Sequence, residues 1–523
     1  MTVVTNKPAD HVSIRTWVAV VGAALGAFLA ILNIQIVSSS LSDIQGAIGA
    51  GSDEGGWITT AYLVAEIIVI PMSGWLARVF STRTYLLTNT VLFLVLTVAC
   101  AFTRNLGQMI VVRALQGFAG GVLIPLAFSI IMTRLPPSRH AIGLSIYSIS
   151  AIFAPSIGPV IGGYFNQTFG WQSIFYVNLL PGSIMLGLLW FALDAEPRQL
   201  HLLRQGDWWG ILSIAIGLGC LETVLEEGEK DDWFGSPFIV RLSVIAAVAL
   251  SVFVFVQLRR KAPLLQLRLL ARRNFGLGTM ANFFFGLSMY TWVYIVPLYL
   301  ARIHGYNSEQ VGYVLIWIGI PQLLMLPLVP ALMRRFDPRK LVAVGYLILI
   351  VGSLLATNLS MSFAGPQFIV SSLIRALGQV LVMTPLSAIA VAGIEREHAG
   401  SAAALFNMTR NLGGAIGIAV LQTFMSKSGK YHSDVITPDV SLLNEATRQR
   451  LDLLTQWFMS KGVSDPEFAR HQAVVEVGRL IRREASILAF SDTIILQSAL
   501  LGLAWLAVLL LKKTRTGNTG EAH

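Results

Sequence analysis

The sequence predicts an all-α polytopic membrane protein with fourteen transmembrane helices. Hydrophobic residues make up 54% of the chain, charged residues only 13%, and the mean hydropathy is +0.67, whereas a soluble domain carries about 25% charged residues. Apolar runs long enough to cross a bilayer recur along the chain. They lack the short alternating pattern of β-barrel strands. This composition excludes a soluble enzyme, a disordered chain and a disulfide-stabilised secreted domain.

Each predicted span is a run of roughly 20 mostly apolar residues, the length that crosses the hydrocarbon core. The first run is too long for the apolar region of a signal peptide, so we interpret it as a transmembrane helix. In order, the runs are 16–38, 56–77, 85–102, 107–133, 141–165, 173–193, 208–225, 238–258, 275–301, 311–333, 341–359, 366–392, 399–425 and 486–511.

Basic residues predict the orientation of the chain, because Lys and Arg collect in cytoplasmic loops. An even number of spans places both termini on one side. If that side is the cytoplasm, 22 Lys and Arg residues, including Lys7, Lys261 and Arg515, lie in cytoplasmic segments, and three lie in short outer loops. We therefore expect both termini in the cytoplasm.

Three sequence matches at similar offsets indicate an internal repeat. Arg113-Ala-Leu-Gln-Gly is matched by Arg375-Ala-Leu-Gly-Gln at an offset of 262 residues. The loop that begins at Gly74 and the pair His140-Ala141 have counterparts at offsets of 257 and 258. Together they indicate a duplicated six-helix unit.

The repeat predicts three parts of the chain. They are an N-terminal six-helix bundle (1–193), an inserted helix pair with cytoplasmic linkers (194–274), and a C-terminal six-helix bundle (275–523) that carries an extracytoplasmic hairpin at 426–484.

Several of these segments resemble motifs of the major facilitator superfamily, and within it the fourteen-helix drug:proton antiporters of the EmrB/QacA type. The helix 4 segment runs from Arg113 through Gln116 to Gly121. The loop after helix 2 and the antiporter motif of helix 5 supply the expected conformational residues, which are Gly74, Arg78, Arg83, Gly158, Pro159, Gly162 and Gly163. The resemblance implies two six-helix bundles plus two inserted helices, with substrate bound between the halves.

The resemblance also implies a function, namely a proton-coupled exporter of amphipathic small molecules that works by alternating access. It further implies a bacterial inner membrane, a periplasmic adaptor protein, an outer-membrane channel and a role in drug resistance. The bilayer is the remaining partner, and no nucleic acid is expected. The sequence has no Gly-x-x-x-x-Gly-Lys-[Ser/Thr] phosphate loop and no His/Cys/Asp cluster. We therefore expect no metal and no cofactor besides the proton gradient.

Three alternative functions remain open. One is a transporter-like sensor without transport, which an intact Arg113 disfavours. Another is an exporter dedicated to a single metabolite or lipid, because one sequence does not reveal how broad a pocket is. The third is a polytopic membrane enzyme, which would need acids or histidines clustered at one membrane face. The inner loops are short and basic instead, so we expect no enzyme.

Four ionisable residues lie deep within spans: Glu66, Arg113, Arg375 and Arg410. A charge at the bilayer centre costs about 2.5–3.5 kcal/mol on insertion scales, so each is a functional candidate. Arg113 and Asn33 lie at similar depths, about 8–9 Å inside the outer ends of their spans, which makes a polar contact feasible. The alternative for Arg113 is a structural role, with backbone carbonyls neutralising its charge.

Proton coupling is the role we assign to Glu66, with Arg113 favouring release of its proton. Members of the antiporter branch carry an Asp in helix 1, where this chain has Asn33. Neither an amide nor a guanidinium titrates near neutral pH. Glu66 is the only deep acid left, and its alternative role is a hydrogen bond to a neighbouring helix. Three further acids are the next candidates, and they lie nearer to span ends or the surface: Asp43, Glu222 and Asp492.

Polar residues in both halves are the candidates for the substrate cavity: Asn33, Gln35, Gln116, Arg375, Asn407, Arg410 and Asn411. Helix packing is the alternative role for the two asparagines beside Arg410. Three deep arginines outnumber one deep acid, so we predict neutral or weakly acidic substrates rather than dications.

Small and aromatic residues predict packing. Gly117, Gly120 and Gly121 share a face with Arg113, which is typical of close helix contact. The glycines of span 5 are expected to let it approach a neighbour across the interface between the halves. The aromatic residues of span 9, from Phe283 to Tyr294, are expected in the core or at the lipid, with stacking on a flat substrate as the alternative.

The long segment 426–484 is predicted to form an outward helical hairpin. Pro438 is expected to open its first helix, whose apolar residues are spaced at helical intervals, and a second helix is expected to run from Pro466 into the last span. The resemblance implies that this hairpin docks the adaptor. The alternative is a solvated hairpin that caps the outer mouth.

Overall fold

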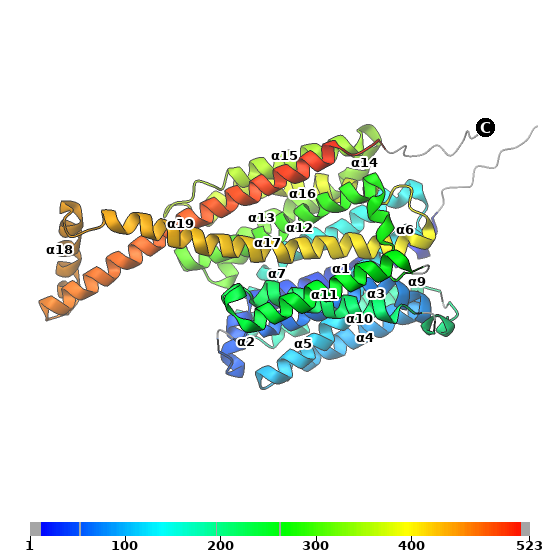
Figure 1. The fold of residues 1–523 in the computed structure, drawn as a ribbon, viewed down its shortest axis with the longest axis horizontal. Coiled ribbons are helices and arrows are strands. Elements are labelled where there is room, and N and C mark those ends of the chain that lie inside the picture. Colours follow the sequence, from blue (N-terminus) through cyan, green and yellow to red (C-terminus); the bar gives the residue numbers. More distant parts are fainter. Residues whose placement is uncertain (1–11, 52–53, 195, 205, 261–262, 514–523) are drawn as a thin grey trace, which may run out of the picture.

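The structure, a computed structural model, describes residues 12–51, 54–194, 196–204, 206–260 and 263–513, and every regular element in these ranges is a helix. Figure 1 shows a bundle of long helices with a helical projection at one end. Lys7, Lys261 and Arg515, which entered the orientation argument, lie outside the described residues.

The helices of the N-terminal half are α1 (Ile14–Ser39), α2 (Leu41–Ile48), α3 (Trp57–Phe80), α4 (Thr82–Ala101), α5 (Leu106–Gly120), α6 (Leu123–Arg134), α7 (His140–Phe169), α8 (Ser173–Tyr176) and α9 (Leu179–Ala192). The inserted pair is α10 (Trp208–Glu227) and α11 (Pro237–Arg259). The C-terminal half consists of α12 (Arg273–His304), α13 (Ser308–Met325), α14 (Val329–Arg335), α15 (Pro338–Leu354), α16 (Phe368–Val391), α17 (Ala399–Ile436), α18 (Glu445–Ser460) and α19 (Pro466–Leu509).

Short 3₁₀ turns connect several of these helices. They are η1 (Pro137–Arg139), η2 (Leu200–Leu203), η3 (Trp233–Gly235), η4 (Leu267–Ala271), η5 (Leu326–Leu328), η6 (Gly365–Gln367), η7 (Arg396–His398) and η8 (Thr437–Asp439). Turn η5 interrupts the tenth predicted span, because Pro327 and Pro330 each lack the N–H that a continuous helix needs.

Twelve helical segments in the described part of the chain are long and apolar enough to cross a membrane. Two further helices lie among them. α15 has 17 residues and packs on α16 and α19, while α17 has 38 residues and packs on α12 and α19. The arrangement is compatible with the fourteen predicted spans.

The two halves touch through four main helix pairs. α7 packs against α13 and α16, and α17 packs against α3 and α6. In Figure 1 the N-terminal half, in blue and cyan, lies below the C-terminal half, in green to red. The two halves therefore meet at a seam between α3, α6 and α7 on one side and α13, α16 and α17 on the other.

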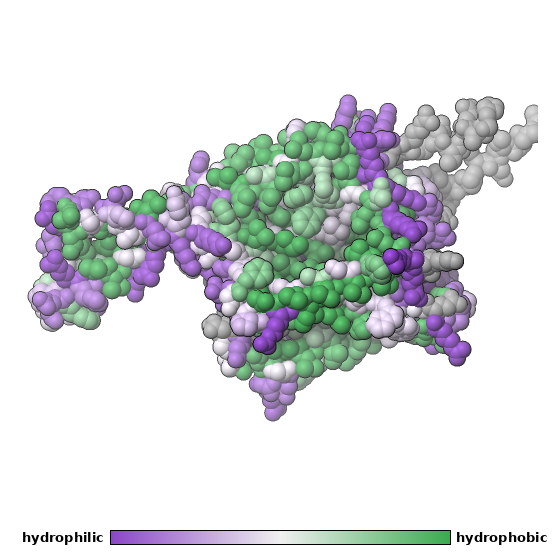
Figure 2. Space-filling view, in the orientation of Figure 1, coloured by the Kyte–Doolittle hydropathy of each residue, from purple (hydrophilic) through white to green (hydrophobic). Residues whose placement is uncertain are grey.

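We name the two ends of the bundle by what they carry. The terminal face is the end where α1 begins and α19 ends, and the hairpin face is the end that carries α18 (Figure 1). Between them, Figure 2 shows a broad apolar surface. On α11, for example, Val244, Val248, Val252 and Phe255 are exposed. Such a surface favours lipid contact.

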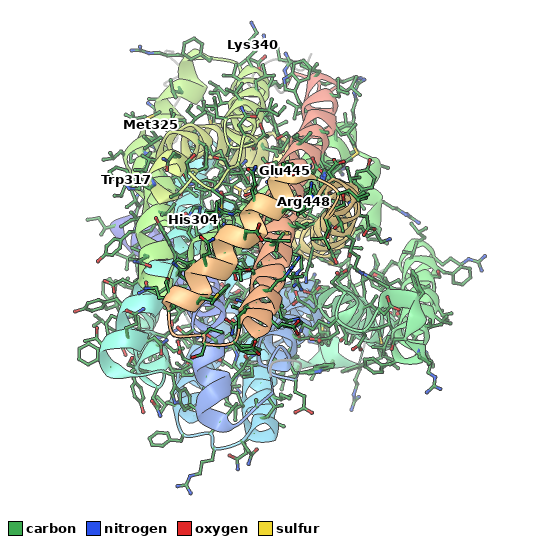
Figure 3. All side chains as sticks on the ribbon, turned by 90° about the vertical axis from the view of Figure 1, so that its left-hand side faces the viewer. His304, Trp317, Met325, Lys340, Glu445 and Arg448 are labelled. Carbon is green, nitrogen blue, oxygen red and sulfur yellow. The ribbon has the colours of Figure 1, made fainter. Side chains whose placement is uncertain are left out.

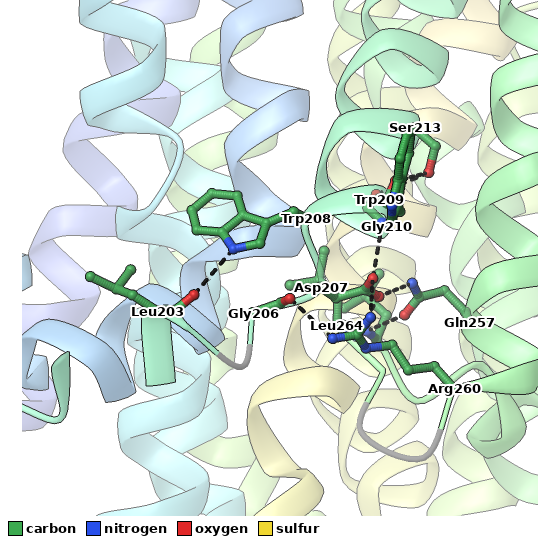
Figure 4. Close-up of polar contacts among 11 residues, drawn as sticks. Leu203, Gly206, Asp207, Trp208, Trp209, Gly210, Ser213, Gln257, Arg260 and Leu264 are labelled. Carbon is green, nitrogen blue, oxygen red and sulfur yellow. Dashed lines mark hydrogen bonds and ion pairs between the residues drawn. The ribbon is translucent and has the colours of Figure 1, made fainter. Parts of the chain in front are cut away.

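A network around Asp207 fastens the inserted pair at the terminal face (Figure 4). Asp207 caps α10 by accepting from the Gly210 backbone N–H at 3.0 Å, and it accepts from Gln257 of α11 at 2.5 Å. Arg260 pairs with its carboxylate at 3.5 Å. Asp207 is buried, so this network joins both inserted helices through one carboxylate. The sequence alone had not singled it out.

The hairpin forms as predicted from Pro466, because α19 runs without a break from there to Leu509. The predicted start of the first helix at Pro438 is wrong. Pro438 lies in η8, and α18 begins at Glu445, where the Asn444 side chain accepts from the Ala446 N–H. Seen from the hairpin side in Figure 3, α18 lies beside α19, with Glu445 and Arg448 near one end of α18. α17 also continues past the predicted span, to Ile436.

Candidate functional site

Arg113 is fully buried on α5 and forms hydrogen bonds with two neighbouring helices, α1 and α3. Its Nη1 donates to Asn33 Oδ1 at 2.7 Å and to Gln116 Oε1 at 2.8 Å, and its Nε donates to the Ile58 carbonyl at 3.2 Å. The guanidinium also lies 4.2 Å from the centre of the Tyr62 ring. The predicted contact between Asn33 and Arg113 is therefore confirmed, and a backbone carbonyl contributes as well.

Gln116 extends this network away from Asn33. Its Nε2 donates to Thr97 at 2.7 Å on α4, and the Cys100 thiol lies 3.6 Å from its Oε1. Asn33 Nδ2 and Arg113 Nη2 are buried and have no hydrogen-bond partner among the described residues. These two N–H donors are thus available for a hydrogen bond to a bound molecule.

The glycines at the end of α5 allow α3 to pack closely against it. A Cβ at Gly117 would overlap the Tyr62 carbonyl, and one at Gly121 would lie 2.9 Å from the Glu66 backbone. The predicted role of this glycine face in helix packing is confirmed.

Glu66 lies on α3 and is only 3% exposed. Its charge interacts with Arg113 of its own half and with Arg410 of the other half. Its Oε2 has no hydrogen-bond partner in the part of the chain that the structure describes. Glu66 is therefore a buried carboxyl at the seam with one oxygen free to take a proton.

Arg375 repeats the arrangement of Arg113 in the C-terminal half. It donates to Ser353 of α15 and to Ser288 Oγ of α12 at 3.1 Å, and it lies 4.0 Å from the Trp292 ring centre. Gln497 of α19 donates to the same Ser288 at 3.0 Å. Trp292 is buried, in agreement with the core placement predicted for the aromatic residues of span 9.

Arg410 lies at the seam, on α17. Its Nη2 approaches the hydroxyl of Tyr147 on α7 at 3.5 Å, and that hydroxyl donates to Asn407 at 2.5 Å. Tyr290 of α12 donates to Asn411 at 3.5 Å. Arg410 Nε and Nη1 are buried without a hydrogen-bond partner among the described residues. This cluster, unlike the other two, links the halves.

The glycines of span 5 contact a different neighbour from the one predicted. A Cβ at Gly158 would overlap Gln35, and one at Gly162 would meet Ser39, both on α1 of the same half. The contact between α7 and the other half uses another face, where Gly312 of α13 meets Val160. The expectation was wrong for Gly158 and Gly162 because a helix has several faces and the spacing did not show which one meets which partner. Pro159 lies within α7, and Gly163 is buried there.

The conformational residues predicted in the loop after span 2 lie at the terminal face, but within helices. Gly74 and Arg78 belong to α3, which continues to Phe80, and Arg83 belongs to α4, which begins at Thr82. Gly74 meets the backbone of Gly400 on α17, so the two halves touch closely there. Arg78 lines a cleft of about 360 Å³ between the halves. Arg83 donates to the Trp190 carbonyl at 3.1 Å and covers that ring.

One functional candidate escaped the sequence analysis, and a second was placed wrongly by it. Tyr147 carries no charge, so nothing in its local sequence indicates a contact across the halves. Glu222 was expected to reach the membrane interface, and this is wrong. It is 4% exposed, because α10 packs against α3 and encloses that face. By contrast, Asp492 is partly exposed and accepts from Ser428 at 2.6 Å and bonds His432 at 2.7 Å.

Comparison with known proteins gives consistent matches over most of the chain. The family profile of the Major Facilitator Superfamily matches residues 23–418. The chain is 30% identical over 476 residues to the "Colistin resistance protein EmrB" of Acinetobacter baumannii, covering 91% of this chain and 92% of the relative. It is 28% identical to the "Multidrug export protein EmrB" of Escherichia coli K12, covering 93% and 94% respectively.

Among solved structures, the chain is similar in fold to the proton:xylose symporter XylE. The TM-score is 0.57, the sequence identity is 15%, and the match covers 94% of this chain and 95% of the symporter. At this identity the likeness concerns the fold.

Proposed function

The chain belongs to the major facilitator superfamily and is a multi-pass membrane protein, and from this premise we propose that it is a proton-coupled exporter of amphipathic small molecules. The names of its relatives, which concern multidrug export and colistin resistance, support this class of function. We further propose that it lies in a bacterial inner membrane, with both termini in the cytoplasm. The substrate would bind at the seam, where Arg410 has donors to spare, and Asn33 of α1 offers a further unpartnered donor beside Arg113.

Glu66 is the proposed coupling group, and the observation that carries the proposal is its burial on α3 at the seam, with one carboxylate oxygen unpartnered among the described residues, where its charge interacts with Arg410 of the other half. When its carboxyl is ionised, its negative charge attracts Arg410 across the seam and so favours the closed arrangement of the halves, while Arg113 of its own half favours release of the proton. When the carboxyl takes up a proton, the attraction across the seam disappears and the seam is free to open. A proton taken up on one side of the membrane thus changes the balance between the two conformations.

The proposal is tested by export from proteoliposomes under an imposed proton gradient. Glu66→Gln is expected to bind substrate but to lose proton-driven export by at least tenfold, because an amide does not titrate. Asn33→Ala is expected mainly to raise KM, since it removes a contact and leaves Glu66 in place.

Glu484→Gln, at an exposed position of α19, is the matched control and should export at the normal rate. Export by Glu66→Gln at the rate of the unmodified protein would show that another group couples the proton.

Neutral or weakly acidic amphipaths are the proposed substrate class. Three fully buried arginines outnumber the acid at the seam, and the unpartnered donors of Arg410 favour an acceptor group on the ligand. Competition among a long-chain carboxylate, a neutral dye and a divalent quaternary ammonium compound tests this. Selective export of the dication would contradict it.

A periplasmic adaptor is the proposed partner of the hairpin. Thr447 and Leu451 of α18 are buried, whereas apolar residues on other faces of the hairpin are exposed. They are Leu442, Leu443, Leu453, Trp457, Phe468 and Val474. Figure 2 shows such apolar atoms on the projecting hairpin. An apolar surface held away from the bundle suits a protein partner. We propose that the adaptor leads on to an outer-membrane channel.

Co-purification with the adaptor tests this contact. Leu453→Glu combined with Trp457→Glu should reduce recovery of the adaptor at least tenfold, because both side chains are exposed on one face of α18. Gln456→Glu adds a charge at a neighbouring exposed position and should leave recovery unchanged. Equal recovery with all variants would mean that the hairpin only covers the mouth of the transporter.

A further inference from the structure

The inserted helix α10 lies directly against the helix that carries Glu66. A Cβ at Gly219 of α10 would lie 3.1 Å from Ile68 and 3.6 Å from Val64, which lie two residues after and two residues before Glu66. Gly219 is therefore level with Glu66 along α3 but packs on the opposite face of that helix. Closer to the hairpin face, Thr60 of α3 donates to Glu227 of α10 at 2.7 Å. The two helices are therefore antiparallel, and the last two turns of α10 face the part of α3 between Thr60 and Glu66.

A row of three acidic residues, the acid row, lies at this end of α10. Glu222, Glu226 and Glu229 follow one another at intervals of four and three residues, which places them on one face if the helical path continues past Glu227. The charge of Glu222 interacts with Glu226 towards the hairpin face and with Glu66 towards the seam. Glu222 is 4% exposed, and its Oε2 has no hydrogen-bond partner within the described ranges.

At Glu229 the acid row ends in a cavity of about 570 Å³ at the hairpin face. Glu229 and Tyr294 lie in its wall, and the charges of Glu226 and Glu229 both interact with Tyr294. Other charged residues of the wall are Arg302, Lys430, Asp434 and Arg482. The acids thus form a series from an open cavity to Glu226, to Glu222 and to Glu66.

Two other roles for these acids fit less well. A metal site needs several ligands at one point, and no group of three or more His, Cys, Asp or Glu side chains in the described residues is placed to hold a metal ion. A purely structural acid would have a partner, as Glu227 has in Thr60 and in Lys230 at 3.0 Å. Glu229, at the cavity, also has a partner, because it accepts from Trp233 at 3.2 Å, so Glu222 is the acid that departs from this pattern. Glu222 Oε2 has none among the described residues, although a buried carboxyl is costly without one.

We propose that the inserted helix pair supplies the proton path to Glu66, with Glu229, Glu226 and Glu222 as successive carriers. Each carboxylate takes a proton from the group before it and passes it on, so that one proton moves from the hairpin side to Glu66 and each carrier is ionised again. On α10 the carriers follow one another at about one helical turn, roughly 5.4 Å along the axis, a gap that one water or a side-chain rotation bridges. The last step, from Glu222 to Glu66, crosses from α10 to α3, and bound water would have to carry it. This inference rests on the proposed function, with Glu66 as the coupling group.

The test compares three conservative variants of the full chain in proteoliposomes. Glu222→Gln should slow both proton-driven export and the accompanying proton flux, followed with a pH dye inside the vesicles, by at least tenfold. Exchange of labelled for unlabelled substrate at equal pH should stay within twofold, because that exchange needs no proton. Glu222→Asp, which keeps a titratable group, should restore most of the rate. Glu227 lies on the same helix but outside the acid row, so Glu227→Gln should transport normally.

The outcomes separate the inference from the function it rests on. If the unmodified protein shows no proton-driven export, the proposed function fails. If Glu66→Gln is inactive but Glu222→Gln and Glu226→Gln transport at the normal rate, only the path through α10 is overturned. If Glu222→Gln does not fold, which size-exclusion chromatography reveals, Glu226→Gln decides, with a loss of at least fivefold expected. If Glu222→Gln and Glu226→Gln slowed substrate exchange as much as they slow proton-driven export, the path would also be overturned.

Discussion

Arg113 and Arg375 each lie against an aromatic ring and bond to a polar side chain from the first helix of their own half, Asn33 and Ser288 respectively. Arg410 differs, because Tyr147 reaches it from the other half. An arginine whose hydrogen-bond partners all lie within one half stabilises that half in every conformation. An arginine at the seam gains and loses partners as the halves move, so it is better suited to substrate binding or coupling.

The close approach at Gly117 should be sensitive to a single methyl group. Gly117→Ala would force Cβ against the Tyr62 carbonyl and should destabilise the protein by about 1–3 kcal/mol, as overpacking does. Thermal unfolding in detergent measures this as a lower Tm. Gly187→Ala is the matched control, because a Cβ there meets nothing within 4 Å. A similar Tm for both variants would mean that α3 and α5 are less closely packed.

Among the elements, α10 and α11 depend on a single buried carboxylate for their attachment at the terminal face. Asp207 serves at once as helix cap, hydrogen-bond acceptor for α11 and ion-pair partner of Arg260. The hairpin is attached differently. α17 and α19 run out of the bundle as continuous helices, so its position follows from helices that are anchored among the spans.

Removal of this carboxylate should loosen the inserted pair. Asp207→Ala leaves Gln257 and the first N–H groups of α10 without their acceptor and should cost about 1–3 kcal/mol. Limited proteolysis at the terminal face should then cut the linkers next to α10 and α11 at least fivefold faster. Asp207→Asn keeps one carbonyl acceptor and should lie between the alanine variant and the original chain. Unchanged cleavage of the alanine variant would show that helix packing alone holds the pair.

For the whole molecule, the seam is closed by glycine contact at the terminal face and by hydrogen bonds near its centre. Gly74 meets Gly400 near the terminal face, and Tyr147 bonds Asn407 deeper in the membrane. Phe128 and Phe406, with ring centres 5.9 Å apart, pack beside that bond. Alternating access requires such contacts to break and re-form, so each of them sets how readily the seam opens.

Loss of the Tyr147 hydroxyl should shift the molecule towards open conformations. Tyr147→Phe removes the donor to Asn407 and the partner of Arg410 and should cost the closed seam about 1–3 kcal/mol. Each 1.4 kcal/mol changes the ratio of two conformations about tenfold. Spin labels at the exposed positions Arg198 and Lys340 should then report a larger share of long distances between the halves.

Tyr85→Phe is the control for this experiment. The Tyr85 hydroxyl is also buried, but it has no hydrogen-bond partner in the described residues, so its removal should leave the distances unchanged. The same shift in both variants would refute a specific role for the hydroxyl of Tyr147.

The sequence by itself determined the helical fold, the approximate positions of the fourteen runs, the repeat and the continuous helix that begins at Pro466. These features are properties of local composition and spacing, since a bilayer selects apolar stretches of fixed length. It also made a contact between Asn33 and Arg113 feasible, because the ends of their spans fix their depth, and the structure confirms that contact. Only the tertiary structure decided which helix faces which. It placed Gly158 against α1, buried Glu222 beside α3, and brought Tyr147 to Arg410. The rotation of each helix about its axis is set by packing with partners that are distant in sequence, and no local pattern contains that information.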